Sequence, residues 1–110
     1  MNRFVLSLVA PILGLLLVAT DAKAISGNGL MESCNGLERS SALGFCVGYV
    51  VAVADVEMAK MKKDFCIPPA VTQGQLAKVA VKWLEENPDK LHFSANSLVS
   101  AAFANSFKCN

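Results

Sequence analysis

The sequence predicts an all-α protein, a small disulfide-stapled helical bundle of four to five helices with up-down topology. Three observations support this fold class. Apolar residues recur at helical spacing in separate segments, and no segment shows the sustained alternation of a half-buried strand. Four cysteines, Cys34, Cys46, Cys66 and Cys109, follow an N-terminal segment with the features of an export leader. Together these features predict a short helical chain that is cross-linked in an oxidising compartment.

The first 24 residues have the layout of a cleaved secretory signal peptide. A short basic start precedes an uncharged, mostly apolar run, and the segment ends with the small residues Ala22 and Ala24 on either side of a lysine. We therefore expect the mature chain to begin at Ile25, and residues 25–110 to form a single periplasmic domain. The apolar run is short for a permanent membrane span, so no stable membrane insertion is expected after cleavage.

The mature chain is small and electrically neutral. Its 86 residues, out of 110, suffice for one core but leave that core marginal without cross-links. The whole sequence has ten basic and nine acidic residues; the leader carries Arg3, Lys23 and Asp21, which leaves eight of each. A neutral chain without a basic stripe has no electrostatic reason to hold nucleic acid or anionic lipid, so neither partner is expected.

The first two helices are predicted from apolar spacing. A short helix after the Gly/Asn-rich entry carries Leu30 and Cys34 and is expected to break near Asn35-Gly36. The central helix is expected from about Ser40 to Met61; its uncharged stretch from Ala42 to Ala54 is thirteen residues long, short of the ~20 that cross a bilayer. The stripe expected to face the core is Leu43, Val47, Val50, Val51, Ala54, Met58 and Met61.

The next helix has clear start and stop signals. Consecutive prolines at 68 and 69 end the preceding segment, because they lack amide donors. Thr72 and Gln75 have the spacing of a capping box, and Asn87-Pro88 stops the helix. Its apolar stripe is Leu76, Val79, Ala80, Trp83 and Leu84.

The last helix is expected to open at Ser94, with Phe93 packed on Leu98 as a hydrophobic staple. It is expected to end near Phe107. The side chains that it should bury are Leu98, Val99, Ala102 and Phe103.

Four cysteines allow three disulfide connectivities, and the sequence alone does not choose among them. Antiparallel helices with short connections narrow the choice, because alternate helix ends share a pole of the bundle. That topology predicts Cys66 paired with Cys109 and Cys34 paired with Cys46. A redox pair or a metal site is the alternative, but the sequence has no Cys-x-x-Cys and only one histidine. No metal or other cofactor is expected.

The sequence offers little for catalysis. His92 is the only imidazole; Asp89 and several serines lie nearby, but no nucleophile elbow or metal motif surrounds them. Asp55 and Glu57 on the central helix are two residues apart, so their side chains diverge by about 200° around the helix and do not converge on one atom. We therefore expect a protein that is not an enzyme.

Several short motifs follow one another in a specific order from about Leu30 to Cys109. The most specific block is Phe65-Cys66-Ile67-Pro68, followed by the capped helix at Thr72. The others are Cys34, Cys46-x-Gly48-Tyr49, Asp55, Trp83-Leu84, Asn87-Pro88, Leu91-His92, Leu98-Val99 and Cys109. In this order the chain resembles the Rap/Tai family of immunity proteins. It departs from the family pattern at Ala52, Ala70 and Lys108, which affects local turns only.

The resemblance implies a small periplasmic protein, often a homodimer, that binds and occludes the active site of a peptidoglycan amidase effector from a type VI secretion system. Such an inhibitor needs a rigid scaffold and a projecting loop rather than catalytic groups. We expect the loop between the last two helices to bind the amidase. Its polar residues are Glu85, Glu86, Asn87, Asp89, Lys90 and His92.

Other interpretations stay open at this point. The same loop is also consistent with an ordinary helix connector. The main alternative function is a periplasmic stress or chaperone-like binding protein with no cognate toxin, which would use exposed apolar surface. A single histidine makes a sharp pH switch hard to build for that role. A saposin-like lipid carrier is a third possibility, but basic amphipathic character is missing.

Overall fold

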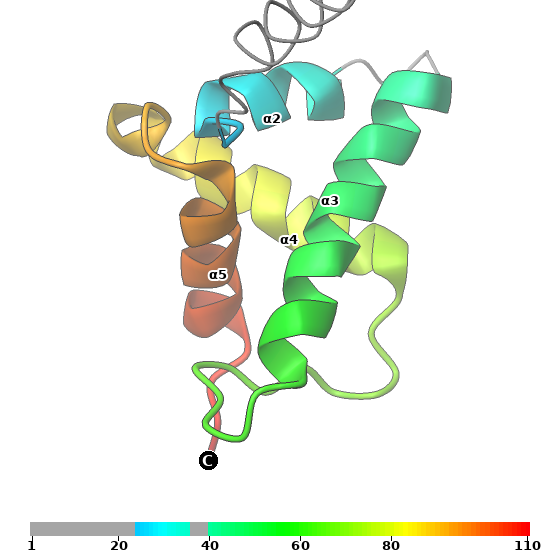
Figure 1. The fold of residues 1–110 in the computed structure, drawn as a ribbon, viewed down its shortest axis with the longest axis vertical. Helices are drawn as coiled ribbons and strands as arrows, with labels where there is room; N and C mark the ends of the chain where they lie inside the picture. The colour runs from blue at the N-terminus through cyan, green and yellow to red at the C-terminus, as the bar shows by residue number, and fades with distance from the viewer. Residues whose placement is uncertain (1–23, 36–39) are drawn as a thin grey trace, which may run out of the picture.

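The computed structural model describes residues 24–35 and 40–110, which form four α-helices and one 3₁₀ turn (Figure 1). These are α2 (Gly27–Asn35), α3 (Ser40–Met58), α4 (Gln73–Glu86), η1 (Pro88–Lys90) and α5 (Ala95–Ser106). The described residues contain no strand, only an isolated antiparallel bridge between Ser26 and Ser94. Except for Ala24, the expected leader lies outside the described residues.

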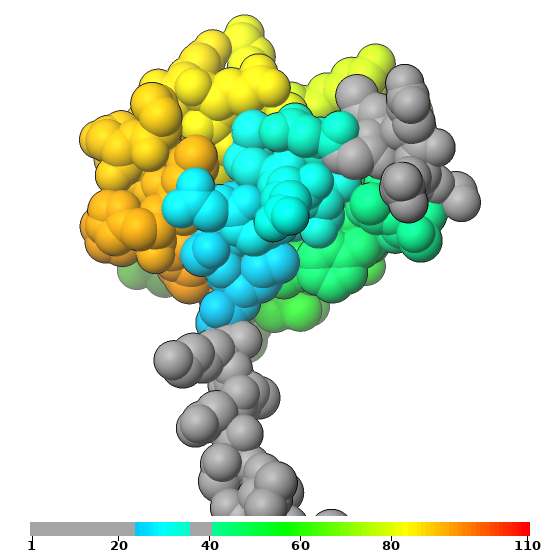
Figure 2. Space-filling model, turned by 90° about the horizontal axis from the view of Figure 1, so that it is seen from above, coloured from blue at the N-terminus to red at the C-terminus, as the bar shows by residue number. Residues whose placement is uncertain are grey.

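The helices follow the predicted up-down path around one core. In Figure 1, α2 lies across one pole, α3 runs to the opposite pole, α4 crosses back, and α5 returns toward the C-terminus. Figure 2 shows the α2 pole from above, with α2 in cyan between the orange residues that lead into α5 and the green start of α3. The largest fully buried side chains come from all four helices and one connection: Leu30, Val50, Phe65, Leu84, Val99 and Phe103.

The central helix differs from its prediction in length. It ends at Met58, because the Lys60 N–H donates to the Glu57 carbonyl at 3.1 Å and so closes a tighter turn. The Lys60 ammonium also lies 2.6 Å from the Glu57 carboxylate, which supports the turn. Met61 therefore lies beyond the helix and is fully exposed, instead of extending the buried stripe.

The face of α3 that enters the core agrees with its prediction in part: Val50 and Ala54 are buried, and Val51 and Met58 pack against the core. The buried residues of α3 are Cys46, Val50 and Ala54, while Leu43 is 36% exposed. Almost every residue of α3 is apolar, so the spacing of apolar residues does not single out one face. The neighbouring helices and the Cys34–Cys46 link select the buried face.

The predicted capping box at the start of α4 is present. The Gln75 N–H donates to the Thr72 hydroxyl at 3.1 Å, and the Thr72 N–H donates to the Gln75 side-chain oxygen at 2.7 Å. Two backbone donors at this helix end are thereby satisfied. The predicted bounds of α5 are confirmed as well, with Ser94 before its first residue and Phe107 after its last.

Two disulfides hold the poles of the bundle, in the pairing that the topology predicts. Cys34–Cys46 joins the end of α2 to α3, and Cys66–Cys109 joins the connection after α3 to the C-terminal tail. The Cα atoms are 5.0 Å apart in each pair. The two links close 12 and 43 residues of chain, which the chain-entropy model values at about 3 and about 4 kcal/mol.

We predict that Thr72→Ala lowers the free energy of unfolding by about 1 kcal/mol, because a first-turn donor of α4 loses its acceptor. Urea unfolding followed by circular dichroism measures this change. Thr72→Ser keeps the hydroxyl and serves as the control. Equal stability of the alanine and serine variants would show that the capping box contributes nothing.

We predict that the two disulfides are reduced in sequence. Cys34 and Cys46 are 3% and 1% exposed, whereas Cys66 and Cys109 are both exposed. Because a thiolate must reach the sulfur that it attacks, a mild reductant should open Cys66–Cys109 first. Alkylation of the new thiols, followed by peptide mass spectrometry, identifies the open pair. Earlier loss of Cys34–Cys46 contradicts the prediction.

Candidate functional site

The connection between α4 and α5 is a short turn with fixed geometry at the α2 pole (Figure 1). Asn87 ends α4: its N–H donates to the Leu84 carbonyl at 3.2 Å, and its side-chain amide donates to the Trp83 carbonyl at 2.8 Å. Pro88 begins η1, where its ring fixes the backbone without removing a needed donor. The Lys90 N–H closes the turn on the Asn87 carbonyl at 3.1 Å. The tip of the loop is therefore stiff.

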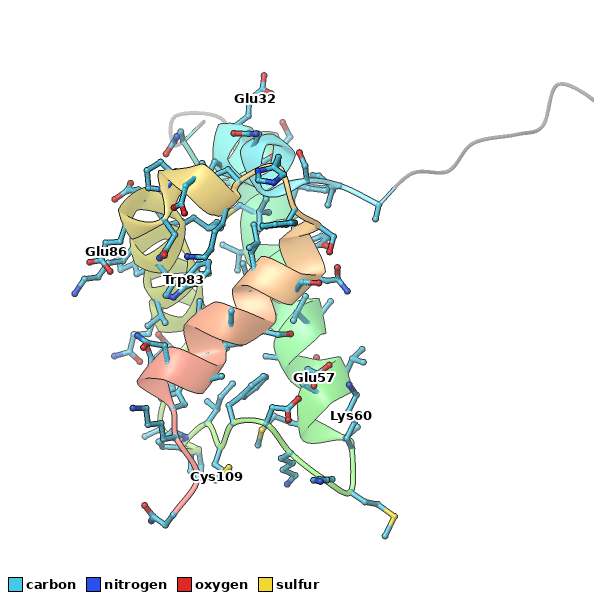
Figure 3. The ribbon with its side chains drawn as sticks, turned by 90° about the vertical axis from the view of Figure 1, so that its left-hand side faces the viewer. Glu32, Glu57, Lys60, Trp83, Glu86 and Cys109 are labelled. Atoms are coloured by element: carbon cyan, nitrogen blue, oxygen red, sulfur yellow. A yellow bond between two sulfur atoms is a disulfide. The ribbon has the colours of Figure 1, made fainter. Side chains whose placement is uncertain are left out.

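The structure brings some of the predicted loop residues together and separates others. The Lys90 ammonium lies 3.3 Å from the Asn87 side-chain oxygen and 3.8 Å from the Asp89 carboxylate, so these residues share the tip. Glu85 and Glu86 belong to the last turn of α4 instead, and Figure 3 shows Glu86 beside Trp83 on that side of the molecule. These charged groups are exposed, so their pairings contribute little to stability and leave them available to a partner.

Phe93 belongs to the loop surface, although the sequence pattern assigned it to a hydrophobic staple. Its side chain is 52% exposed. The centroid of its ring lies 4.2 Å from that of His92, with the two planes tilted by 36°. Aromatic side chains, Phe among them, are enriched in protein interfaces relative to the rest of the surface. The signal in the sequence was the His-Phe pair directly after the proline turn.

The described residues show no assembled catalytic or metal-binding group. No set of three His, Cys, Asp or Glu side chains among them is placed to hold a metal ion. His92 is exposed, and within the described chain no hydrogen bond links it to a serine or a carboxylate. A hollow of about 520 Å³ lies between α2, α3 and α4. Its walls are Cys34, Asn35, Leu43, Cys46, Val47, Gly74, Ala77, Lys78, Val81, Lys82 and Glu85.

The outward side of α3 is the main apolar surface of the described molecule. Phe45 and Val56 are 49% and 63% exposed, and the ring of Tyr49 lies 6.1 Å from that of Phe45. Burial raises the pKa of Tyr49, and a backbone hydrogen bond with Asn96 acts in the opposite direction. A hollow of about 270 Å³ runs along this side between α3 and α5.

One described helix, α3, is long and apolar enough to cross a membrane by length and composition alone. The segment Ser41–Met58 has a mean hydropathy of 1.5, and 22% of it is buried. Core helices of soluble domains pass the same test. In this fold α3 packs its inner side against the other helices and is disulfide-bonded to α2.

The described residues form a small helical domain with an exposed, hydrogen-bonded loop between α4 and α5. Comparison with known families identifies the family of this domain. The chain matches the family model of the Rap1a immunity proteins over residues 26–109. It therefore belongs to the Rap1a immunity family, as the order of its motifs predicts. No curated protein matches the chain.

Proposed function

We propose that this protein is a periplasmic immunity protein that binds a peptidoglycan amidase effector of a type VI secretion system and occludes its active site. The observation that carries the proposal is the family match over residues 26–109, because immunity proteins act by binding an effector toxin. The protein has no catalytic role in this proposal.

The proposed route to the periplasm is export with cleavage after Ala24. The two disulfides support it, because such links persist in oxidising compartments. The family match begins at residue 26, directly after the proposed cleavage site. Ile25 also belongs to the folded domain, since its carbonyl accepts a hydrogen bond from the Ala95 N–H at 2.8 Å. Cleavage at this site would leave the whole domain intact.

The loop of residues 87–94 is the proposed contact with the amidase. Its turn is fixed by Asn87 and Pro88, so little conformational entropy is lost when a cleft closes around it. The exposed ring of Phe93 supplies apolar contact area, while Asp89 and Lys90 offer polar groups to a cleft that recognises a peptide. Inhibition then requires only that the loop fill the space which the substrate needs.

We predict that Phe93→Ala weakens binding of the amidase at least ~30-fold, which corresponds to about 2 kcal/mol, because an interfacial anchor is removed. Met61→Ala is the matched control: it removes a fully exposed apolar side chain from the connection after α3. Titration calorimetry with an amidase from the same genome measures the affinity. Co-expression in the periplasm, scored as rescue from lysis, measures protection.

Two results would count against this proposal in different ways. If the wild-type protein neither binds nor neutralises any amidase from the same genome, the immunity function is wrong. If it binds, but Phe93→Ala binds as tightly as Met61→Ala, the loop is an ordinary connector and the contact lies elsewhere.

We also propose that the protein forms a homodimer through the outward side of α3. Soluble monomers rarely leave an apolar helix side uncovered, and here the exposed Phe45 and Val56 share that side with Gly44 and Gly48. A Cβ at either glycine would meet nothing within 4 Å, so a second helix could approach closely. In an antiparallel pair crossing between Gly48 and Ala52, Phe45 of one copy would face Val56 of the other.

We predict that Phe45→Glu converts the homodimer to a monomer, because two carboxylates would be buried at the crossing. Analytical ultracentrifugation of the wild type and the variant measures this, with Phe93→Glu as the control of similar exposure. A monomeric wild type contradicts the dimer. In that case the uncovered side of α3 favours the chaperone-like alternative, which predicts that the wild type, but not Phe45→Glu, keeps a reduced unfolded client from aggregating.

A further inference from the structure

The second half of the α4–α5 loop is bonded to the residues that begin the domain. Figure 2 shows these first residues, in blue, packed against the orange residues before α5. Three backbone hydrogen bonds connect the two segments: Gly27 N–H to the Phe93 carbonyl at 2.9 Å, Asn28 N–H to the Leu91 carbonyl at 2.8 Å, and Ala95 N–H to the Ile25 carbonyl at 2.8 Å. The second half of the loop is thus held by a segment more than sixty residues away in sequence.

These hydrogen bonds provide acceptors for backbone N–H groups in the first turns of two helices, where no acceptor exists within the same helix. The N–H groups of Gly27 and Asn28 lie in the first turn of α2, and that of Ala95 lies in the first turn of α5. Ser26 completes the start of α2, since its hydroxyl accepts from the Gly29 N–H at 3.2 Å. The partial positive charge at the start of α2 also favours the two loop carbonyls. Each helix start is therefore capped by the segment that leads into the other helix.

Gly27 is the point of closest approach between the two segments. It is buried, and a Cβ built on it would lie 2.9 Å from the Leu91 carbonyl oxygen and 3.0 Å from the Leu91 Cα. The Leu98 side chain, 2.5 Å from that Cβ, can rotate away, but the Leu91 contacts are with backbone. Any larger residue at position 27 must therefore push the loop backbone outward. Only glycine allows the loop to sit where it does.

We propose that residues 25–28 form a clamp that fixes the conformation of the toxin-binding loop, and that Gly27 is a positioning residue for immunity. The functional part of this inference rests on the proposed function of the loop. A loop that is already ordered loses less entropy on binding, so loosening the clamp weakens binding without removing any contact residue. Cleavage after Ala24 preserves the clamp, whereas a chain that starts at Gly27 lacks both the Ile25 acceptor and the Ser26 cap.

The test uses the mature chain with Gly27→Ala and needs two measurements. Hydrogen exchange should become at least tenfold faster at the hydrogen-bonded amides of residues 91–95, while the buried amides of α4, and those of α5 beyond Ala95, keep their protection. Affinity for the amidase should fall at least tenfold. Gly74→Ala is the matched control, because its Cβ would meet only the Thr72 hydroxyl at 4.0 Å. A chain beginning at Gly27 is a second variant and should loosen the same amides.

The possible results of these measurements distinguish a failure of the clamp from a failure of the proposed function. Exchange at residues 91–95 that equals that of Gly74→Ala overturns the clamp, and this measurement requires no toxin. Faster exchange with unchanged affinity overturns the positioning role, as does global loss of protection in both Gly27→Ala and the shortened chain. Failure of the wild-type protein to bind any amidase overturns the proposed function instead, whatever the exchange rates show.

Discussion

The Cys34–Cys46 disulfide fixes α2 to the bundle, and the position of α2 determines the shape of the α4–α5 loop. α2 has nine residues, too few for a helix that is stable alone, so it needs tertiary attachment. The disulfide supplies that attachment at its C-terminal end, and Leu30, fully buried, supplies it in the middle. Once α2 is in place, its N-terminal donors hold the carbonyls of Leu91 and Phe93.

The loop is stiff at both ends for different reasons. Its first half is fixed locally, by the side chain of Asn87 and the ring of Pro88. Its second half is fixed from a distance, by the start of α2. Between these supports lies an exposed aromatic pair, His92 and Phe93, next to a charged tip. A surface of this kind suits binding by shape, which is the mode of action in the proposed function.

Features that depend on residues close together in the sequence could be predicted more fully than features that depend on distant residues. The capping box at Thr72 and the bounds of α5 were predictable because their signals lie within a few residues. The cysteine pairing followed from helix topology. The buried face of α3 was predicted only in part, correctly at Val50 and Ala54 but not at Leu43, because most residues of that helix are apolar and its neighbours select the face. The clamp was not predictable, since Gly27 and Leu91 are far apart in sequence and interact through backbone atoms.

Because the domain has no net charge, long-range attraction does not assist binding, and the rigidity of the loop matters more for affinity. Residues 25–110 include as many acidic as basic residues, so their net charge does not accelerate the encounter with a partner over long distances. High affinity must then come from slow dissociation of the complex. Slow dissociation depends on well-packed contacts whose formation loses little conformational entropy. Under the proposed function, Phe93 and the turn at Pro88 would supply such contacts only while the backbone between them is held. In the proposed binding mode, affinity therefore depends on hydrogen bonds made by residues 25–28, none of which lies within the loop itself.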